Sequence, residues 1–323
     1  MNSPTPHLTS DTANITTDSN ITSPMNQLPR REFEGQKLKK APNLFQRLPQ
    51  SGAAMTGLGI IGFWLILAIL VPFLPLPSPL QQHPELIYSS ADPASISNPL
   101  PQVGHWLGAD SKGRDMLARL LWGAQTVLWV APLAAFFAYL VGIPLGLLAG
   151  YYGKWVDQLI SRVCDIILSF PIIILYVILI SAIGSSLWNI VIAVILTASP
   201  GIARIVRGLT LEQRPLDYIA AAKLRRENDL YVMFIEILPN CRGPLITDFC
   251  LRIGYTIITV GILGFLGLGL PPPNPDWGSM IRDGTGVISS FPLMSIIPAL
   301  AVISLVLGFN LLADGVRELS MSD

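Results

Sequence analysis

Five long stretches of the chain contain no charged side chain, and their spacing predicts the fold. They cover residues 48–84, 120–153, 166–203, 253–275 and 284–313. A helix needs about 20 apolar residues to cross the hydrocarbon core of a bilayer. The stretch 166–203 has room for two such helices, with a tight turn at Gly184-Ser185-Ser186. The pattern therefore predicts an all-α polytopic membrane protein with six transmembrane helices.

The segments between the predicted spans differ in composition and give the domain organisation. The spans are expected at residues 55–74, 126–148, 160–180, 187–206, 245–266 and 293–312. We expect a disordered, partly basic N-tail at 1–50, the first span within 51–76, a segment with an amphipathic helix at 77–121, a core of five spans at 122–318 with a polar loop at 211–240, and a short tail at 319–323. The N-tail is rich in Ser, Thr, Asn and Pro, and such a segment buries too little apolar area to fold.

The distribution of Lys and Arg predicts the orientation in the membrane. With the N-terminus in the cytoplasm, the cytoplasmic segments hold 16 basic residues and the outer segments hold 4, while Arg252, near the start of the fifth span, completes the 21. Basic residues are enriched in cytoplasmic loops. Both termini and the loop 211–240 are therefore predicted to be cytoplasmic, and 77–121 is predicted to be extracytoplasmic.

Composition narrows the class of protein further. Hydrophobic residues make up 51% of the chain and charged residues 13%, against roughly 25% charged in soluble domains. The net charge is zero, so nothing favours a nucleic-acid partner. The three cysteines show no metal-ligand spacing and are interpreted as structural thiols. The three histidines, His7, His83 and His105, do not lie near one another in the sequence, which argues against a multispan membrane enzyme. Neither a catalytic residue nor a metal ligand is predicted.

Two further patterns concern the spans themselves. Gly142, Gly146 and Gly150 recur every four residues in the second span, and such a face lets helix backbones approach closely. Ionisable residues are expected only at span ends, including Asp248 and Arg252. Charges inside spans usually mark ion-coupled carriers, so a carrier or channel working alone is the disfavoured alternative. No G-x-x-x-x-G-K-[ST] phosphate loop occurs, so a nucleotide would have to bind to another polypeptide.

The polar loop 211–240 is the longest insertion between two predicted spans. Pro215 fits the first turn of a helix, Asp217 suits the positive end of its dipole, and a helix is predicted over 218–226. Residues 227–229 predict a break, with Asn228 or Asp229 capping a second helix. Residues 230–238 are apolar on most sides and are expected to pack under the spans until Pro239 stops the helix. The loop is then either a docking surface for a soluble partner or an amphipathic linker on the lipid surface.

This loop resembles the EAA loop of permease subunits in bacterial ABC importers. Aligned through the closing Ile237-Leu238-Pro239, the match includes Ala221 and Ala222. Ala220 stands where the family has Glu, and Arg226 stands where it has Gly. The Gly lets the chain turn between two short helices, and Asn228 is the residue expected to take over that turn because Asn tolerates a left-handed conformation.

Other segments narrow the resemblance to the C-type subunit of the dipeptide/oligopeptide/nickel permease group. Residues 107–115 read LGADSKGRD, and with Leu117, Arg119, Leu120 and Gly123-Ala124 they are similar to that group's LGTDxxGRDxLSRLxxGA signature. Residues 265–269 read FLGLG, and with Pro272 and Trp277-Gly278 they are similar to its FLGLG…PP…WG segment. The resemblance covers about residues 50–318. It implies a type I ABC importer permease fold, with 122–318 as the core permease domain.

The resemblance also implies partners and site residues. The partners are a second, B-type permease subunit, two ABC ATPase subunits that bind ATP and Mg, an extracytoplasmic substrate-binding protein, and the lipid of the bacterial inner membrane; this chain itself would bind no cofactor. The resemblance assigns ATPase coupling to Pro215, Asp217, Tyr218, Ala220, Ala221, Ala222, Lys223, Arg225 and Arg226. It also implies that an outer gate or binding-protein docking surface is formed by Asp110, Gly113, Arg114, Asp115, Arg119 and Trp277. The alternative for residues 110–121 is an interfacial anchor, with Arg114, Asp115 and Arg119 solvated or paired with one another.

The expected function is therefore import rather than catalysis. The chain would form half of the translocation path of an ATP-driven importer of di- or oligopeptides. Nickel or another small solute of the same group is the alternative substrate.

Overall fold

The computed structural model of the protein describes residues 48–83, 105–271 and 274–321. The predicted tail up to residue 47 lies outside these ranges. Within them, α-helix dominates, and β contacts are limited to two isolated bridges, Gln82 with Arg114 and Ala109 with Asp115. The all-α prediction is confirmed.

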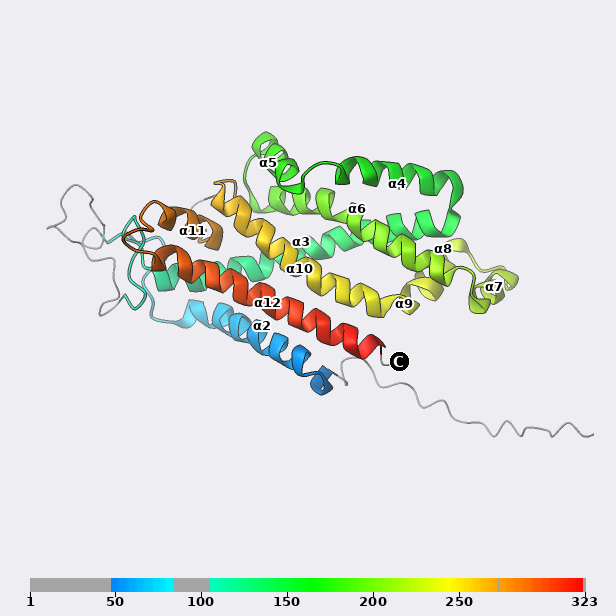
Figure 1. The fold of residues 1–323 in the computed structure, drawn as a ribbon, viewed down its shortest axis with the longest axis horizontal. Helices are drawn as coiled ribbons and strands as arrows, with labels where there is room; N and C mark the ends of the chain where they lie inside the picture. The colour runs from blue at the N-terminus through cyan, green and yellow to red at the C-terminus, as the bar shows by residue number, and fades with distance from the viewer. Residues whose placement is uncertain (1–47, 84–104, 272–273, 322–323) are drawn as a thin grey trace, which may run out of the picture. The chain divides into compact units, whose positions relative to one another are not determined.

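The helices follow the chain in the order shown in Figure 1. They are α2 (Gly52–Leu70), α3 (Met116–Tyr152), α4 (Lys154–Leu168), α5 (Ile172–Ile183), α6 (Leu187–Gln213), α7 (Asp217–Leu224), α8 (Asp229–Tyr231), α9 (Leu238–Asn240), α10 (Arg242–Phe265), α11 (Trp277–Thr285) and α12 (Leu293–Met321). Two 3-10 turns (Leu48–Gln50 and Val71–Phe73) flank α2, and a π-helical segment (Val232–Ile237) joins α8 to α9.

Five helices in the described ranges are long and apolar enough to cross a membrane: α2 with its 3-10 extension, α3, α6, α10 and α12. A sixth span exists only if α4 and α5 are counted together, and these two helices meet at 86°. The span expected at 160–180 is therefore present only as a broken one, divided between α4 and α5. Pro171 lies at the break and precedes α5, and proline disfavours helical conformation in the residue before it.

The turn predicted after this region is present. α5 ends at Gly184, which adopts φ +85°, and α6 begins at Leu187. The Ser186 side chain accepts a hydrogen bond from the main-chain N–H of Asn189 and so caps α6.

Helix α3 is longer than the span predicted at 126–148. The side chain of Asp115 accepts a hydrogen bond from the Ala118 N–H and caps the helix, which then continues to Gly153. The amphipathic helix expected within 77–121 is therefore not a separate element, because its last residues form the first turns of α3. At about 1.5 Å per residue, 37 residues extend well beyond a 30 Å hydrocarbon core.

The most extensive helix pair is formed by α3 and α6. The structure places Gly142, Gly146 and Gly150 against α6, where a methyl group on any of them would overlap main-chain or side-chain atoms of residues 199–210. α4 packs on the other side of α6 through two ion pairs, Arg204 with Asp165 at 2.7 Å and Arg207 with Asp157 at 2.5 Å. These contacts build one half of the bundle.

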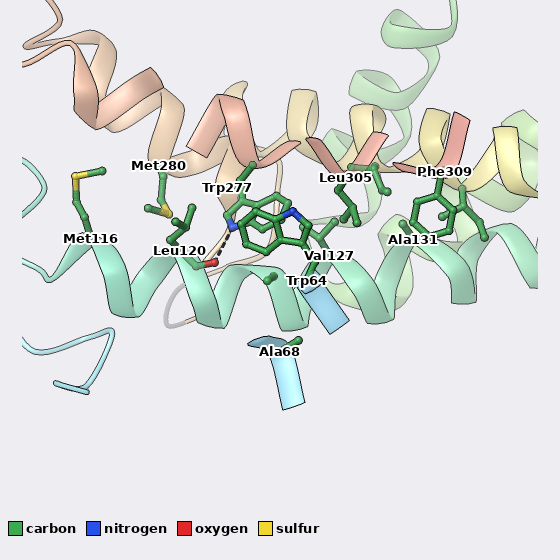
Figure 2. Close-up of a cluster of buried hydrophobic side chains, with 14 of the residues drawn as sticks. Trp64, Ala68, Met116, Leu120, Val127, Ala131, Trp277, Met280, Leu305 and Phe309 are labelled. Atoms are coloured by element: carbon green, nitrogen blue, oxygen red, sulfur yellow. Dashed lines mark hydrogen bonds between the residues drawn. The ribbon is translucent and has the colours of Figure 1, made fainter. Parts of the chain in front are cut away.

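The other half is a core between α2, α3, α11 and α12, shown in Figure 2. Trp64 and Trp277 meet edge to face with ring centroids 5.0 Å apart, and Leu305 and Phe309 of α12 pack beside them. The start of α2 lies beside the end of α12, where the Ser51 hydroxyl donates to a carboxylate oxygen of Glu318 at 2.9 Å. The tail predicted to begin at 319 instead continues α12 to Met321.

The prediction that charges occur only at span ends is wrong for α10. Asp248 and Arg252 are its seventh and eleventh residues, so they lie about 9 and 15 Å from its first residue. Arg252 is thus near the middle of a 24-residue helix. The sequence-based boundary placed the start of this span three residues too late, at 245.

Candidate functional site

Helix α7 is the element on which the predicted coupling site depends. It begins at Asp217, with Leu216 as its N-cap residue. Pro215 lies in the turn before it rather than in its first turn, so that prediction is wrong. Asp217 occupies the first helical position, where its negative charge is favourable to the helix dipole.

The two faces of α7 differ sharply in burial. Ile219 and Ala222 are fully buried, in a cluster with Leu147 of α3 and Val206 of α6. On the opposite face, Ala220 and Ala221 are exposed, and Leu224 is 86% exposed. Exposed apolar residues at i, i+1 and i+4 form a narrow apolar ridge that can enter a groove of another protein.

Arg226 ends α7 in a left-handed conformation with φ +58°. The N–H of Glu227 donates to the Ala222 carbonyl at 3.3 Å, and the N–H of Arg226 donates to the Lys223 carbonyl at 2.9 Å. These two bonds form a Schellman motif, in which glycine is the usual left-handed residue. Asn228 is extended, at φ −65° and ψ 143°, so the expectation that it takes over the turn is wrong. Arg226 itself makes it.

The loop is tied to the end of α3 by polar contacts. The hydroxyls of Tyr151 and Tyr152 donate to the two carboxylate oxygens of Asp229 at 2.8 and 3.1 Å. The ammonium group of Lys223 lies 5.1 Å from the centre of the Tyr151 ring, a cation–π distance. Arg225 pairs with Glu236 at 3.1 Å. The loop that carries α7 is therefore anchored to the end of α3.

The second half of the loop departs from prediction in detail. Asn228 caps α8 by accepting from the Leu230 N–H, as expected. Val232, Met233 and Ile237 are buried under the spans, but Leu230 and Ile235 are exposed. Pro239 lies in the first turn of α9 and does not stop the helical path, because proline lacks only an N–H that is unsatisfied there anyway.

The cysteine that follows α9 is structural. Cys241 is buried, and burial, with a smaller contribution from the charge of Glu212, raises the pKa of its thiol. The thiol is therefore protonated at neutral pH and unreactive.

At the other end of the bundle, the predicted outer residues converge on Arg114. Its guanidinium binds Asp110 through Nε at 2.7 Å and reaches Asp283 of α11 through Nη2 at 3.0 Å. The second carboxylate oxygen of Asp110 accepts from the main-chain N–H groups of Lys112 and Arg114. Gly113 adopts φ +73° in this turn, a conformation that favours glycine. The network joins the segment before α3 to α11.

Asp115 and Arg119 have separate partners. Asp115 caps α3 and pairs with the His105 ring at 2.7 Å. Arg119 is 3% exposed, and its Nε lies 3.4 Å from Asp110. The interpretation of these charges as solvated or paired with one another is therefore wrong for this structure.

Trp277 is fully buried at the start of α11. Its indole N–H donates to the main-chain oxygen of Leu120 at 2.8 Å, as Figure 2 shows. We assign this side chain to helix packing, because in this conformation it offers no surface to a docking protein.

Asp276 caps α11 from a buried position. Its two carboxylate oxygens accept from the N–H groups of Gly278 and Ser279 at 3.1 and 3.2 Å. Burial raises the pKa of this carboxyl to about 6, although the hydrogen bonds and Arg119 act in the opposite direction. Gly264 and Gly269 leave the space that the carboxylate fills, which gives the FLGLG segment a packing role.

A cavity of about 190 Å³ lies at this end of the bundle. Its charged lining comprises Lys112, Arg114, Arg119, Asp276, Arg282 and Asp283. Lys112 and Arg282 are the exposed members, and both lie within 4 Å of an oxygen of Asp283. A basic rim of this kind suits an acidic surface of another protein.

The family model described as "Binding-protein-dependent transport system inner membrane component" matches residues 142–320. This range contains α7, the glycine seam on α3 and the whole of α10. The chain belongs to this family.

Two relatives of this chain are permease proteins of transport systems. The glutathione transport system permease protein GsiD of Pectobacterium atrosepticum is 41% identical over 218 residues, which cover 68% of this chain and 72% of the relative. The dipeptide transport system permease protein DppC of Alkalihalophilus pseudofirmus is 38% identical over 276 residues, which cover 85% and 87%. Both are permeases of the C-type group indicated by the sequence motifs.

Solved structures show the same fold. Two crystal forms of the methionine ABC transporter MetNI in inward-facing conformations match with TM-scores of 0.52 and 0.53 at 20% identity. Each match covers 64% of this chain and 98% of the other. The type I importer permease fold is confirmed. Membership in the family implies a separate substrate-binding protein and an ATPase as partners.

One exposed residue of the coupling site was missed by sequence reasoning. Leu224 was not among the predicted coupling residues, whereas the predicted Ala222 is buried. The i, i+3, i+4, i+7 spacing of Asp217, Ala220, Ala221 and Leu224 could have identified this face.

Proposed function

We propose that this inner membrane component is one permease subunit of an ATP-driven importer of di- or oligopeptides, and that it forms half of the translocation path. The observation that carries the proposal is the exposed apolar ridge of α7, formed by Ala220, Ala221 and Leu224 on a loop anchored to α3. The names of the dipeptide and glutathione permeases support a peptide substrate. Nickel or another small solute of the group remains the second candidate.

In this proposal the ridge of α7 binds a groove on an ABC ATPase subunit. Two such subunits bind ATP and Mg, and this chain binds neither. ATP shifts the transporter between two states because its affinity differs between them. The contacts of Lys223 and Asp229 with α3 then convert movement of the ATPase into movement of the spans.

We infer that the α7 end of the bundle is cytoplasmic and the α11 end extracytoplasmic. The excess of Lys and Arg in the segments assigned to the cytoplasm supports this orientation. Because the start of α2 and the end of α12 lie together, the orientation would place both termini in the cytoplasm. The substrate-binding protein then docks at the α11 end, on the rim that contains Lys112 and Arg282, and a B-type permease subunit completes the path.

The test is Ala221→Arg in the complete transporter reconstituted with its binding protein. A bulky cation on the ridge should abolish peptide uptake and the ATPase stimulation by loaded binding protein, while the chain still inserts in the membrane. Glu212→Arg is the control, since it places the same side chain on an exposed position outside α7. Unchanged uptake by the Ala221 variant would show that α7 is not part of the coupling interface. Uptake of nickel but of no dipeptide by the wild-type complex would show that the substrate is nickel and not a peptide.

A further inference from the structure

The cavity at the α11 end of the bundle is lined by four cations, and most of them lack a hydrogen-bonded carboxylate. Among the described residues, only Arg114 of the four donates to carboxylates, those of Asp110 and Asp283. The ammonium of Lys112 lies 3.6 Å from an oxygen of Asp283, and Arg282 Nη2 lies 3.7 Å from the other. Both distances exceed the usual N–H···O range of about 2.7–3.2 Å. Three cations therefore share Asp283, and it hydrogen-bonds to one of them.

The fourth cation, Arg119, is buried in the wall of the cavity. Its side chain is 4% exposed, and its Nε lies 3.4 Å from Asp110. This Nε has no hydrogen-bond partner among the described residues, and Nη1 donates to the Pro79 carbonyl only at the long distance of 3.5 Å. Burying a charged donor is unfavourable unless it is fully hydrogen-bonded. The chain itself therefore balances the charge of Arg119 only in part.

The remaining acid of the lining, Asp276, does not bind these cations directly. Its two carboxylate oxygens accept from the main-chain N–H groups of Gly278 and Ser279. With Asp110 and Asp283 it gives three carboxylates against the four cations. The cavity therefore carries an excess positive charge when all these groups are ionised.

The glycines of the FLGLG segment make room for the charges of this cavity. Gly267 adopts φ +83°, and the Arg282 guanidinium lies where a side chain at this position would be. Gly264 and Gly269 leave the corresponding space to the carboxylate of Asp276. A side chain at 267 would push Arg282 away from the cavity. The segment therefore keeps a cation in place as well as packing α10 against α11.

The size of the cavity favours a single acidic side chain over a whole solute. Its volume is about 190 Å³, below the roughly 300–1,000 Å³ of sites that enclose a small ligand. Lys112 and Arg282 are 52% and 45% exposed, so a protein that docks at this end can reach both. Hydrogen bonds from Lys or Arg to a carboxylate are among the strong ones in proteins.

We propose that an Asp or Glu side chain of the substrate-binding protein enters this cavity when that protein docks. Its carboxylate binds the ammonium of Lys112 and the guanidinium of Arg282, while Arg114 and Arg119 form the positive wall behind it. The lining comes from the segment before α3, from α3 itself, from α11 and from the turn between α5 and α6. The inserted side chain therefore contacts the permease where these elements meet. The inference rests on the proposed function, which places the α11 end outside the cytoplasm.

The first experiment measures docking directly. The complete transporter is held in nanodiscs, and the purified binding protein of the same system, labelled with a fluorophore, is the probe. Lys112→Gln and Arg282→Gln should each raise the Kd by about tenfold, the scale of one lost charged hydrogen bond. Arg162→Gln is the matched control, because it removes one exposed positive charge from α4 and should leave the Kd unchanged.

A charge-reversal series then identifies the acidic partner. Arg282→Glu should abolish docking, and one lysine among single Asp→Lys and Glu→Lys substitutions on the binding protein should restore it. Wild-type affinity in both glutamine variants, or docking that no lysine restores, would overturn the proposal. The assay requires no transport. A wild-type complex that docks normally but imports no Ala-Phe would therefore contradict the proposed substrate and not this contact.

The second experiment distinguishes the cavity from its rim. Ser185 lines the cavity, so Ser185→Cys places a thiol there, whereas the natural cysteines Cys164, Cys241 and Cys250 are buried. An anionic methanethiosulfonate should label this thiol faster than a cationic one, because the lining is positive. Saturating binding protein should slow the labelling by about tenfold. Equal rates with and without it would rule out insertion, and slowing by acetate but not by the binding protein would assign the cavity to a free carboxylate instead.

Discussion

The indole nitrogen of Trp277 lies 2.8 Å from the main-chain oxygen of Leu120, and this bond fixes α11 to the second turn of α3. The indole ring rests directly over Gly123, where a Cβ would come within 2.6 Å of Cδ1. Two sequence motifs separated by about 150 residues, one containing Gly123 and the other Trp277-Gly278, are therefore two sides of a single contact. Their joint presence in the sequence has a packing reason.

Gly123→Ala should destabilise the protein. The added methyl group must displace the indole or the backbone of α3, and such overpacking costs about 1–3 kcal/mol. We expect the midpoint of thermal unfolding in detergent to fall by several degrees. Gly59→Ala on α2 is the matched control, because no atom lies within 4 Å of its Cβ position and alanine favours helix over glycine. Equal midpoints for the two variants would contradict the assigned contact.

Arg226→Gly should stabilise the end of α7. A non-glycine residue in the left-handed region costs about 1 kcal/mol or more, and glycine removes that cost. Hydrogen exchange of the Arg226 and Glu227 amides, which close the Schellman motif, should slow by about fivefold, the equivalent of 1 kcal/mol. Arg226→Ala loses the same side chain but keeps the strained backbone, so its exchange should not slow. If both variants slowed alike, the side chain rather than the φ angle would be responsible.

Asp276 should make stability depend on pH. Its folded pKa of about 6 is above the unfolded value of 3.8, so its contribution is fully present below pH 3.8 and is lost as the pH rises through 6. The full difference is about 3 kcal/mol. Asp276→Asn can still cap α11 but does not ionise. The unfolding midpoint of this variant, relative to that of the wild type, should therefore rise between pH 4 and pH 7. Parallel curves for the two proteins over this range would contradict a buried, shifted carboxyl.

The sequence predicted the class and most helices because each depends on local pattern. Charge-free runs located the first residues of α2, α6 and α12 to within three positions, and the glycine turn at 184 separated α5 from α6. The predictions failed where length alone was used. The run 160–180 is long enough to span, yet Pro171 divides it into α4 and α5, and the amphipathic residues before 121 joined α3 because nothing between them and the span breaks a helix.

The sequence identified the segments that contain the candidate sites, but it did not identify which of their side chains are exposed. The polar loop 211–240 and the charged run 107–119 were identified in the sequence, but which side chains remain exposed depends on what packs beneath them. Ala222 is buried and Leu224 is exposed because α7 rests on α3 and the π-helical segment. Trp277 appears in a motif that suggested docking, and it is buried because Gly123, far away in the chain, leaves room for its ring.

By itself, the sequence determined that this is a polytopic helical membrane protein with an EAA-type loop. Long apolar runs favour insertion into lipid, and short motifs can be identified from neighbouring residues alone. Only the tertiary structure decided that Arg114 joins the segment before α3 to α11 and that Arg252 lies in the middle of α10 beside Gly201. Each of these depends on a contact between helices distant in the chain, and the free energy of such a contact is set by close packing and burial that no local pattern contains.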